Sequence, residues 1–333
     1  MKKAIITGIT GQDGGYLAKL LLSKGYKVYG AQRRNTGKRY WRLDELGITD
    51  KIEFVDIDLG EPYNIEKVIE QIQPDEFYNL AAQSFVGLSF DQPQVTTITN
   101  SLGVLNILEV LRHKFPKCKF YQASTSEMYG KVIETPQRET TRFHPRSPYG
   151  CAKAYSHYLT QNYRESYGLF ACSGILFNHE SPMRGEEFVT RKITKGLVEY
   201  TKNGKVLELG NIESYRDWGH AEDYVEAMWL MLQQDEPEDF VISTGKTIQI
   251  KDFIVRCLDE LQIAYEFNGH EVIDKHNRQY IIKTNPKFFR PAEVDLLVGD
   301  STKAKEKLLW RPKHTLKTLV SDMIKEDLRS DGL

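Results

Sequence analysis

The chain has 333 residues, of which 40% are hydrophobic and 27% are charged. This size and composition predict about two domains of an ordinary folded protein and exclude a disordered chain, a collagen or a coiled coil. The 45 Lys and Arg residues balance 46 Asp and Glu residues, giving a formal net charge of -1, so no overall field draws the protein to nucleic acid or to an anionic membrane. An anionic ligand must therefore be held by a local cluster of cations.

The four cysteines are far apart and include no C-x-x-C pair, so neither a zinc site nor a disulfide framework is indicated. The N-terminus has a three-residue apolar run before Thr7, too short for a signal peptide, and no apolar run in the sequence is long enough to span a membrane. We expect no metal, no membrane partner and a location in the reducing cytoplasm.

Short apolar runs alternate with helical patterns along the first half of the chain. We expect strands at residues 4–6, 28–31, 52–55, 77–80, 120–123 and 170–176, and helices at residues 16–22, at residues 65–72 and in a long segment ending near residue 113. This alternation predicts an α/β fold with a Rossmann-type, doubly wound parallel sheet. Beyond residue 178 the strands become sparse, and charged helical patterns at residues 223–234 and 251–261 predict a smaller α+β lobe. We therefore expect a first domain over residues 1–177, to which about residues 211–245 return, and a substrate-binding lobe over residues 178–333.

The first predicted strand runs directly into three glycines, Gly8, Gly11 and Gly14, at the turn into a helix. Backbone N–H groups at such a helix N-terminus can approach a pyrophosphate, so the spacing predicts a dinucleotide site. The expected contacts of this turn are Gly8, Thr10, Gly11, Gln12, Asp13 and Gly14.

The end of the second strand indicates which dinucleotide binds. Arg33 and Arg34 stand where an acidic residue would bind the ribose of NAD, and guanidinium groups suit the additional phosphate of NADP. We therefore predict NADP, leaving open which arginine holds the phosphate and whether the other belongs to a solvated loop or a subunit contact. The remaining expected cofactor contacts follow the third and fourth strands: Asp58, Leu59, Leu80, Ala81, Ala82 and Gln83.

Tyr149 and Lys153 open a helix four residues apart and share one of its faces. A nearby ammonium favours the phenolate, which can take a hydroxyl proton as hydride leaves the same carbon. The run Thr125, Ser126 and Glu127 follows the fifth strand, and the carboxyl ends of parallel strands meet in one crevice. These five residues are the predicted catalytic set; the alternative for the serine and threonine run is a turn cap.

At this point the sequence resembles the GDP-mannose 4,6-dehydratases, within the extended short-chain dehydrogenase/reductase superfamily. The resemblance rests on the glycine motif, on the Tyr-x-x-x-Lys pair, and on strings spread from the first strand almost to the C-terminus: YNLAAQS (78–84), FYQASTSEMYG (120–130), PRSPYGCAK (145–153), GILFNHESP (174–182), FVTRK (188–192), RDWG (216–219), residues 223–234 and FRPAEVD (289–295).

The resemblance implies an NADP-dependent lyase that converts GDP-mannose into GDP-4-keto-6-deoxymannose. Tyr149 would remove the proton of the 4-hydroxyl while hydride passes to the cofactor. Glu127 would then take the proton from carbon 5 and help to expel the 6-hydroxyl as water, with Thr125 and Ser126 holding the 4-oxygen, before hydride returns to carbon 6. The resemblance adds His179 and Arg184 to the cofactor contacts, and it assigns the GDP-sugar to Ser84, Asn178, Lys192, Arg216, Arg290 and Glu293.

Several residues depart from the usual family pattern, namely Phe85, Met183 and His144, and residues 267–287 are rich in charge. These departures keep open the same reaction on GDP-D-glycero-D-manno-heptose. A nucleotide-sugar epimerase or reductase is a more distant alternative, since elimination of water needs a base such as Glu127 in addition to the hydride step. The resemblance also implies a homo-oligomer, a tetramer, with the arginine-rich residues 33–42 near a subunit contact.

Overall fold

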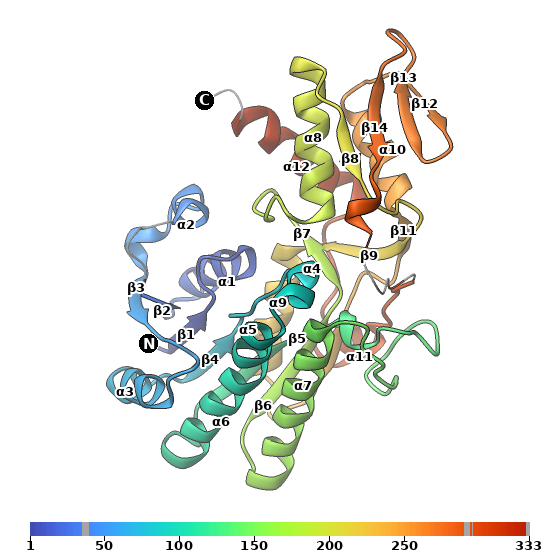
Figure 1. Ribbon diagram of the computed structural model, residues 1–333. Helices are drawn as coiled ribbons and strands as arrows, with labels where there is room; N and C mark the ends of the chain where they lie inside the picture. Colours follow the sequence, from blue (N-terminus) through green and yellow to red (C-terminus); the bar gives the residue numbers. More distant parts are fainter. Residues whose placement is uncertain (35–39, 290–293, 295, 331–333) are drawn as a thin grey trace.

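The computed structural model describes residues 1–34, 40–289, 294 and 296–330. Its centre is a seven-stranded parallel sheet in the order β10-β6-β5-β4-β1-β2-β3 (Figure 1). The strands are β1 (Lys3–Thr7), β2 (Lys27–Gln32), β3 (Glu53–Asp56), β4 (Glu76–Asn79), β5 (Lys119–Thr125), β6 (Ala171–Leu176) and β10 (Phe240–Ile242). The predicted Rossmann-type sheet is confirmed, and its order reverses between β1 and β4, where a crevice opens at the carboxyl ends of the strands.

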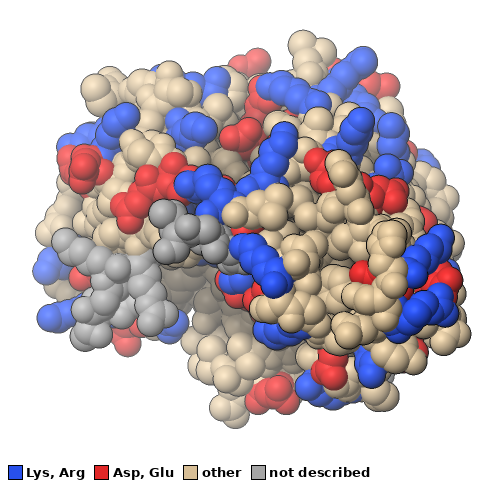
Figure 2. All heavy atoms as spheres, turned by 90° about the horizontal axis from the view of Figure 1, so that it is seen from above, with Lys and Arg blue, Asp and Glu red and all other residues tan. Residues whose placement is uncertain are grey.

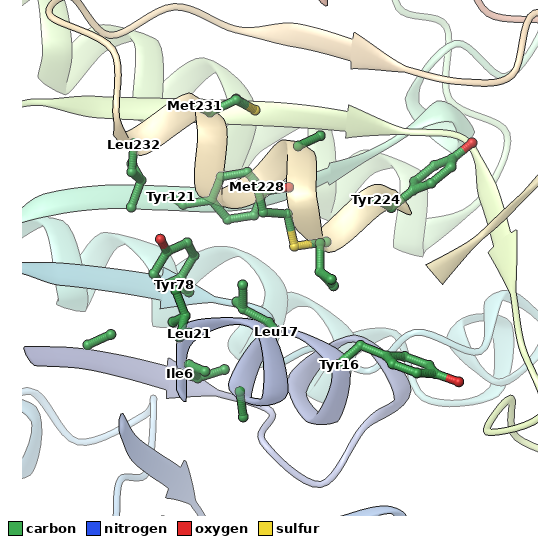
Figure 3. Close-up of a cluster of buried hydrophobic side chains, with 14 of the residues drawn as sticks. Ile6, Tyr16, Leu17, Leu21, Tyr78, Tyr121, Tyr224, Met228, Met231 and Leu232 are labelled. Carbon is green, nitrogen blue, oxygen red and sulfur yellow. The ribbon is translucent and has the colours of Figure 1, made fainter. Parts of the chain in front are cut away.

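Two hydrophobic layers cover the sheet because successive strand residues point to opposite faces. Ile5 and Phe120 pack beneath α3 (Pro62–Ile72), α6 (Gly103–Lys114) and α7 (Pro148–Tyr167). The adjacent residues Ile6 and Tyr121 pack instead with α1 (Gln12–Ser23) and α9 (Ala221–Leu232) (Figure 3). Thus α9, although late in the sequence, completes the core of the first-half sheet.

The segment between β4 and β5 differs from the single long helix that the sequence predicts. It contains α4 (Val86–Asp91), α5 (Pro93–Thr97), a π-helical turn η2 (Ile98–Leu102) and then α6. Gln92 precedes Pro93 and has φ -127° and ψ 58°, outside the helical region, as expected for a residue whose successor is proline. The prediction of one helix is therefore wrong, and proline sterics explain the break.

The second half holds more strands than its charged helical patterns predict. A three-stranded sheet contains β7 (Asn178–Glu180), β9 (Tyr215–His220) and β11 (Thr247–Gln249), and a four-stranded sheet contains β8 (Leu207–Leu209), β12 (Tyr265–Asn268), β13 (Glu271–Asp274) and β14 (Tyr280–Thr284). The expectation of sparse strands is wrong, because strands this short carry too few residues to show a clear period. Residues 267–287 belong to the four-stranded sheet, in which β12 and β13 form an antiparallel hairpin.

The helices of the second half pack around this four-stranded sheet. They are α8 (Val189–Asn203), α10 (Ile250–Glu260) and α12 (Leu316–Ser330), and they share one hydrophobic core with β8, β13 and β14. The short helices α2 (Trp41–Glu45) and α11 (Thr302–Lys307) and the single 3-10 turns η1 (Thr49–Lys51), η3 (Ser126–Met128) and η4 (Pro286–Phe288) complete the described elements.

Across the described residues, every helix is too short or too polar for a membrane span. Seen from above, acidic and basic side chains are interspersed over the surface, and the face is hollowed near its middle (Figure 2). The division into domains at residue 177 stays a prediction.

Candidate active site

The turn from β1 to α1 has a backbone geometry that requires glycine. Gly8 has φ +69°, and a Cβ atom there would lie 2.9 Å from the backbone nitrogen of Ala81. A Cβ atom at Gly14 would lie 2.4 Å from the carbonyl oxygen of Gly8. Gly11 is the N-cap of α1, and its N–H donates to the same carbonyl oxygen at 2.9 Å. The turn therefore brings the N-terminus of α1 to the carboxyl edge of the sheet, as a bound pyrophosphate requires.

Asp13, in the first turn of α1, forms a partly buried ion pair with His179 of β7. His179 Nε2 lies 2.8 Å from Asp13 Oδ2, and His179 Nδ1 lies 2.8 Å from the carbonyl oxygen of Phe177. Both partners are acceptors, so both ring nitrogens donate and the ring is an imidazolium. Burial alone would lower the pKa of His179, but the Asp13 carboxylate outweighs burial and raises it. In the same way burial alone would raise the pKa of Asp13, but the imidazolium lowers it.

A second connection between the same turn and the later half of the chain comes from Arg42, which sequence reasoning placed only within a loop near a subunit contact. Arg42 Nη1 donates to the carbonyl oxygen of Thr10 at 3.1 Å, and Arg42 Nε donates to that of Met183 at 2.7 Å. Gln12 Nε2 adds a bond of 3.1 Å to the carbonyl oxygen of His179. No sequence signal distinguishes Arg42 from its basic neighbours, because its partners are carbonyl oxygens.

The structure brings Arg33 and Arg34 together with Asp58 at one pocket. A cavity of about 530 Å³ lies beyond the ends of β2 and β3 and is lined by Arg33, Arg34, Asp56, Ile57, Asp58 and Asn64. Asp58 Oδ1 accepts from the N–H of Gly60 at 2.9 Å, and the carbonyl oxygen of Leu59 accepts from Asn106 at 2.7 Å. The pocket thus offers two guanidinium groups where sequence reasoning expects the adenosine end of the cofactor.

The residues that follow β4 are held in place by side chains of neighbouring elements. The N–H groups of Leu80 and Ala81 both donate to Thr7 Oγ1 at 3.1 Å. Gln83 exchanges two bonds of 2.9 Å with Asn100, which lies in the π-helical turn η2. Ala82, between these fixed positions, is partly exposed. The π-helical turn is a feature that sequence reasoning missed, and it contains the Asn100 side chain that bonds to this segment.

Strand β5 and helix α7 bring the predicted catalytic residues together. Ser147 caps α7 by accepting from the N–H of Gly150 at 3.0 Å, and Pro148 occupies the first turn, where it needs no N–H partner. This start places Tyr149 close enough to Thr125 for the Thr125 hydroxyl to oppose the rise in the pKa of the Tyr149 phenol. Thr125 in turn caps the turn η3, which contains Ser126 and Glu127, both buried. The capping alternative for Thr125 and the catalytic interpretation are therefore compatible.

Burial sets the protonation of the Tyr149 and Lys153 pair. It raises the pKa of Tyr149 to about 12, and the Glu127 carboxylate acts in the same direction. Burial also lowers the pKa of Lys153 to about 8. Lys153 Nζ lies 5.9 Å from the centre of the Tyr149 ring and donates to the carbonyl oxygen of Ala123 at 2.9 Å. Without ligands, the Tyr149 phenol is therefore neutral at pH 7, and the Lys153 ammonium lies near its ring.

Arg184 contacts two residues near the start of the second half of the chain, Glu180 and Phe188. Its Nε lies 3.0 Å from Glu180 Oε2, and its guanidinium stacks 3.5 Å from the centre of the Phe188 ring. Phe188 meets Phe85 edge to face, with ring centres 6.0 Å apart. The charge of Arg184 also acts on Tyr149.

The residues that the resemblance assigns to the GDP-sugar lie on separate elements around the crevice. Ser84 is exposed after β4, Asn178 begins β7 and Lys192 lies in α8, with its ammonium 3.5 Å from the centre of the Phe288 ring. Arg216 is buried in β9, where Nη1 donates to the carbonyl oxygen of Tyr215 at 2.8 Å. Arg290 and Glu293 lie outside the described residues.

Three side chains elsewhere have metal-binding atoms within 4.8 Å of one another: His220, Glu222 and His314. The two rings stack with centres 4.1 Å apart at 20°, so their nitrogen lone pairs do not converge on one point. His220 Nδ1 also accepts from the N–H of Glu222 at 3.1 Å, which leaves the proton of the neutral ring on Nε2. We assign no metal to this group.

The fold is that of the extended short-chain dehydrogenases/reductases. Two solved structures show the same fold over nearly the whole chain. The dTDP-glucose 4,6-dehydratase of Streptomyces venezuelae, with NAD and a ligand abbreviated TYD bound, is 20% identical with a TM-score of 0.85, covering 99% of this chain and 98% of that chain. A UDP-glucose 4-epimerase from Thermotoga maritima is 24% identical with a TM-score of 0.84, covering 98% and 99%.

Sequence comparison identifies the family within this class. The family profile described as GDP-mannose 4,6 dehydratase matches residues 5–323. A GDP-mannose 4,6-dehydratase of Yersinia enterocolitica is 49% identical, covering 99% of this chain and 94% of that protein. The human GDP-mannose 4,6 dehydratase is 46% identical, covering 98% and 91%. The chain belongs to the GDP-mannose 4,6-dehydratase family.

Proposed function

We propose that the protein converts GDP-mannose into GDP-4-keto-6-deoxymannose by oxidation at carbon 4, loss of water across carbons 5 and 6, and reduction at carbon 6. Given the family, the observation that carries this proposal is that Glu127 and Tyr149 are both buried and that the Glu127 carboxylate and the Thr125 hydroxyl both act on the Tyr149 phenol. The relatives described above are named for GDP-mannose, so mannose is favoured over the heptose substrate.

The residues present fit a nicotinamide dinucleotide, and we propose NADP. The glycine turn leaves no room for a Cβ atom at Gly8 or Gly14, and Arg33 and Arg34 line the cavity beyond β2. When bound, the cofactor would accept hydride from carbon 4 and return it to carbon 6. Binding titrations should give a lower Kd for NADP than for NAD, and substitution of Arg33 or Arg34 by Ala should reduce that preference; equal affinities would contradict NADP.

In the oxidation step, Tyr149 would take the proton of the sugar's 4-hydroxyl, and Thr125 would hold the 4-oxygen. Tyr149 can take this proton only as the phenolate, so its own proton would first have to pass to solvent. Because burial raises the pKa of the phenol to about 12, the Lys153 ammonium has to stabilise that phenolate. The contact of Lys153 with Ala123 keeps that ammonium close to the phenol. Ser126, buried beside Thr125, would relay protons.

The elimination needs a second proton-transfer group, and we assign it to Glu127. The ketone at carbon 4 acidifies the hydrogen on carbon 5, so a carboxylate can remove it and then deliver a proton to the departing 6-hydroxyl. Glu127 is 9% exposed, and its charge acts on Tyr149. A simple epimerase needs the hydride step alone, so Glu127 favours the dehydratase.

The diphosphate and guanine of the substrate would be bound by cations and amides of the second half. Arg216 is suited to phosphate oxygens because its planar fork donates two bonds at once. We also keep Ser84, Asn178, Lys192, Arg290 and Glu293 as proposed substrate contacts, and His179 and Arg184 as proposed cofactor contacts.

The decisive experiment incubates the purified protein with GDP-mannose and follows the 4-keto sugar by mass spectrometry. Loss of one water from the sugar with no net consumption of NADP is the expected result. The Glu127→Gln variant should still oxidise carbon 4 but should not eliminate water, so reduced cofactor should accumulate. If the wild-type protein yields only an epimer of GDP-mannose, the proposal is refuted. A parallel reaction with the GDP-heptose should be slower.

We further propose a homo-oligomer. Val95, Ile98 and Leu102, spaced three and four residues apart, are between 45% and 48% exposed, and Tyr155 and Tyr158 of the adjacent helix α7 are 45% and 54% exposed. Apolar side chains gathered on neighbouring helices favour a protein contact, and a second copy of the chain is the partner that the resemblance implies. Light scattering should give a multiple of the chain mass, and we expect that of a tetramer; a single-chain mass at working concentration would refute the oligomer.

The location in the cytoplasm stays a prediction from the cysteine pattern.

A further inference from the structure

Three consecutive residues of β5 contact three residues of α7 that are spaced four apart. The carbonyl oxygen of Ala123 accepts from Lys153, and the Thr125 hydroxyl acts on the Tyr149 phenol. Between them, Ser124 Oγ lies 3.1 Å from Nδ1 of His157. Residues at i, i+4 and i+8 lie on one helix face, so His157 continues the row that Tyr149 and Lys153 begin. Sequence reasoning did not identify His157 as part of this row.

His157 is buried and belongs to a polar network that extends away from the catalytic pocket. Gln161 Nε2 lies 3.1 Å from His157 Nε2 and donates to Asp239 Oδ2 at 2.9 Å. Asp239 also accepts two bonds from Arg164, at 3.0 Å and 2.8 Å. Asp239 lies directly before β10, so the network reaches from β5 through α7 to the edge of the sheet.

The network determines which ring nitrogen of His157 carries the proton. Because Asp239 accepts from Gln161, the atom of Gln161 that faces both groups is the amide nitrogen, which only donates. His157 Nε2 must then accept, and the proton of the neutral ring lies on Nδ1, which donates to Ser124 Oγ. Burial lowers the pKa of His157, in agreement with a neutral ring.

We propose that His157 is a positioning residue that fixes the distance between the two catalytic elements, β5 and α7, by donating from Nδ1 to Ser124. The inference rests on the proposed function. Ser124 lies between Ala123, which accepts from Lys153, and Thr125, which acts on the Tyr149 phenol. A shift of Ser124 relative to α7 would therefore disturb both neighbours at once. Displacements near 1 Å can cost roughly 100-fold in rate when reacting groups must be aligned.

His157 does not itself act on the sugar. It is 1% exposed and lies eight residues beyond Tyr149, a rise of about 12 Å along the helix. Its expected effect is therefore on kcat at saturating GDP-mannose, while KM for GDP-mannose and the amount of bound nicotinamide should stay within about two-fold of wild type.

The test compares variants that keep or remove the donor. In His157→Asn the amide nitrogen can take the place of Nδ1, so we expect kcat within about three-fold of wild type despite a lower Tm from the lost acceptor for Gln161. His157→Leu removes the donor, and kcat should fall roughly 10- to 100-fold. Ser124→Ala removes the acceptor with a minimal change in size, and should lower kcat similarly even if His157→Leu fails to fold. The double variant should lose no more than either single one.

The outcomes distinguish a failure of the positioning role of His157 from a failure of the proposed dehydratase activity. If Ser124→Ala keeps the kcat of wild type, or if kcat follows Tm across the variants rather than the presence of the donor, the positioning role is wrong while the dehydratase proposal stands. If the wild-type protein does not dehydrate GDP-mannose, the proposed function fails first, and that result is seen before any variant is measured.

Discussion

Replacing His179 by leucine should destabilise the fold by about 2–3 kcal/mol near pH 6, because the Asp13 carboxylate then loses its cation. The side chains of the pair are 10% and 24% exposed. They therefore lie between a fully buried pair, whose disruption costs about 3–5 kcal/mol, and an exposed pair worth about 0–1 kcal/mol. With about 2.1 cal/mol/K of unfolding entropy per residue, the 333 residues give about 0.7 kcal/mol/K, so Tm should fall by about 3–4 °C.

The loss should depend on pH with a definite sign. The folded pKa of His179 is raised above its ordinary value of 6.5, so the stabilisation is fully present below about 6.5 and is lost as pH rises through the folded pKa. The folded pKa of Asp13 is lowered from 3.8, so its contribution is present above that value and is lost as pH falls through the folded pKa. The difference between wild type and variant should be largest near pH 6 and should shrink in alkaline buffer.

The assay is thermal unfolding of protein freed of nucleotide, because a change in cofactor affinity would otherwise alter Tm. His113→Leu is the matched control, since His113 is 61% exposed and meets Glu109 at the surface; its effect should stay within about 0.5 kcal/mol. The reasoning is refuted if His179→Leu costs no more than the control, or if the difference between wild type and variant increases with pH.

Four further predictions concern the site. Tyr149→Phe should lower kcat at least about 100-fold while the extracted nicotinamide stays constant; a small loss would assign the base elsewhere. Gly14→Ala should prevent retention of the cofactor or folding, because its Cβ atom would lie 2.4 Å from the Gly8 carbonyl oxygen; a stable holoenzyme would contradict the packing argument. Arg216→Ala should raise KM for GDP-mannose about 10-fold or more, equivalent to about 1.4 kcal/mol, with cofactor binding unchanged; an unaltered KM would remove Arg216 from the substrate site. Since the pKa of Lys153 is lowered to about 8 and that of Tyr149 is raised to about 12, kcat/KM should rise with pH up to about 8 as phenolate forms and level off above it, because the loss of the ammonium then cancels the gain in phenolate; a profile that keeps rising beyond that pH would contradict this role.

Local sequence patterns predict those parts of the site whose geometry is set by residues close together in the sequence. The glycine turn and the four-residue spacing of Tyr149 and Lys153 are features of one short segment each, and the structure has the expected geometry at both. The helix break at Pro93 could also be predicted from the sequence, because proline keeps the residue before it out of the helical conformation.

Contacts that depend on the order of strands could not be predicted in this way. His157 reaches Asp239 through Gln161 only because β10 returns to pair with β6, and no property of either segment predicts that pairing. Arg42 bonds to the carbonyl oxygens of Thr10 and Met183. Every residue has a backbone carbonyl oxygen, so the sequence does not indicate which of them Arg42 contacts.

The choice between epimerase and dehydratase also lies outside the fold. A solved structure named for an epimerase and one named for a dehydratase match this chain with TM-scores of 0.84 and 0.85, so the backbone can serve either reaction. Both reactions need a hydride acceptor and a base at the 4-hydroxyl, which Tyr149 would supply. Only the loss of water needs a further proton-transfer group, and the cap of η3 by Thr125 places the Glu127 carboxylate where its charge acts on Tyr149. The proposed reaction would therefore depend on one side chain, Glu127, in a single turn that directly follows β5.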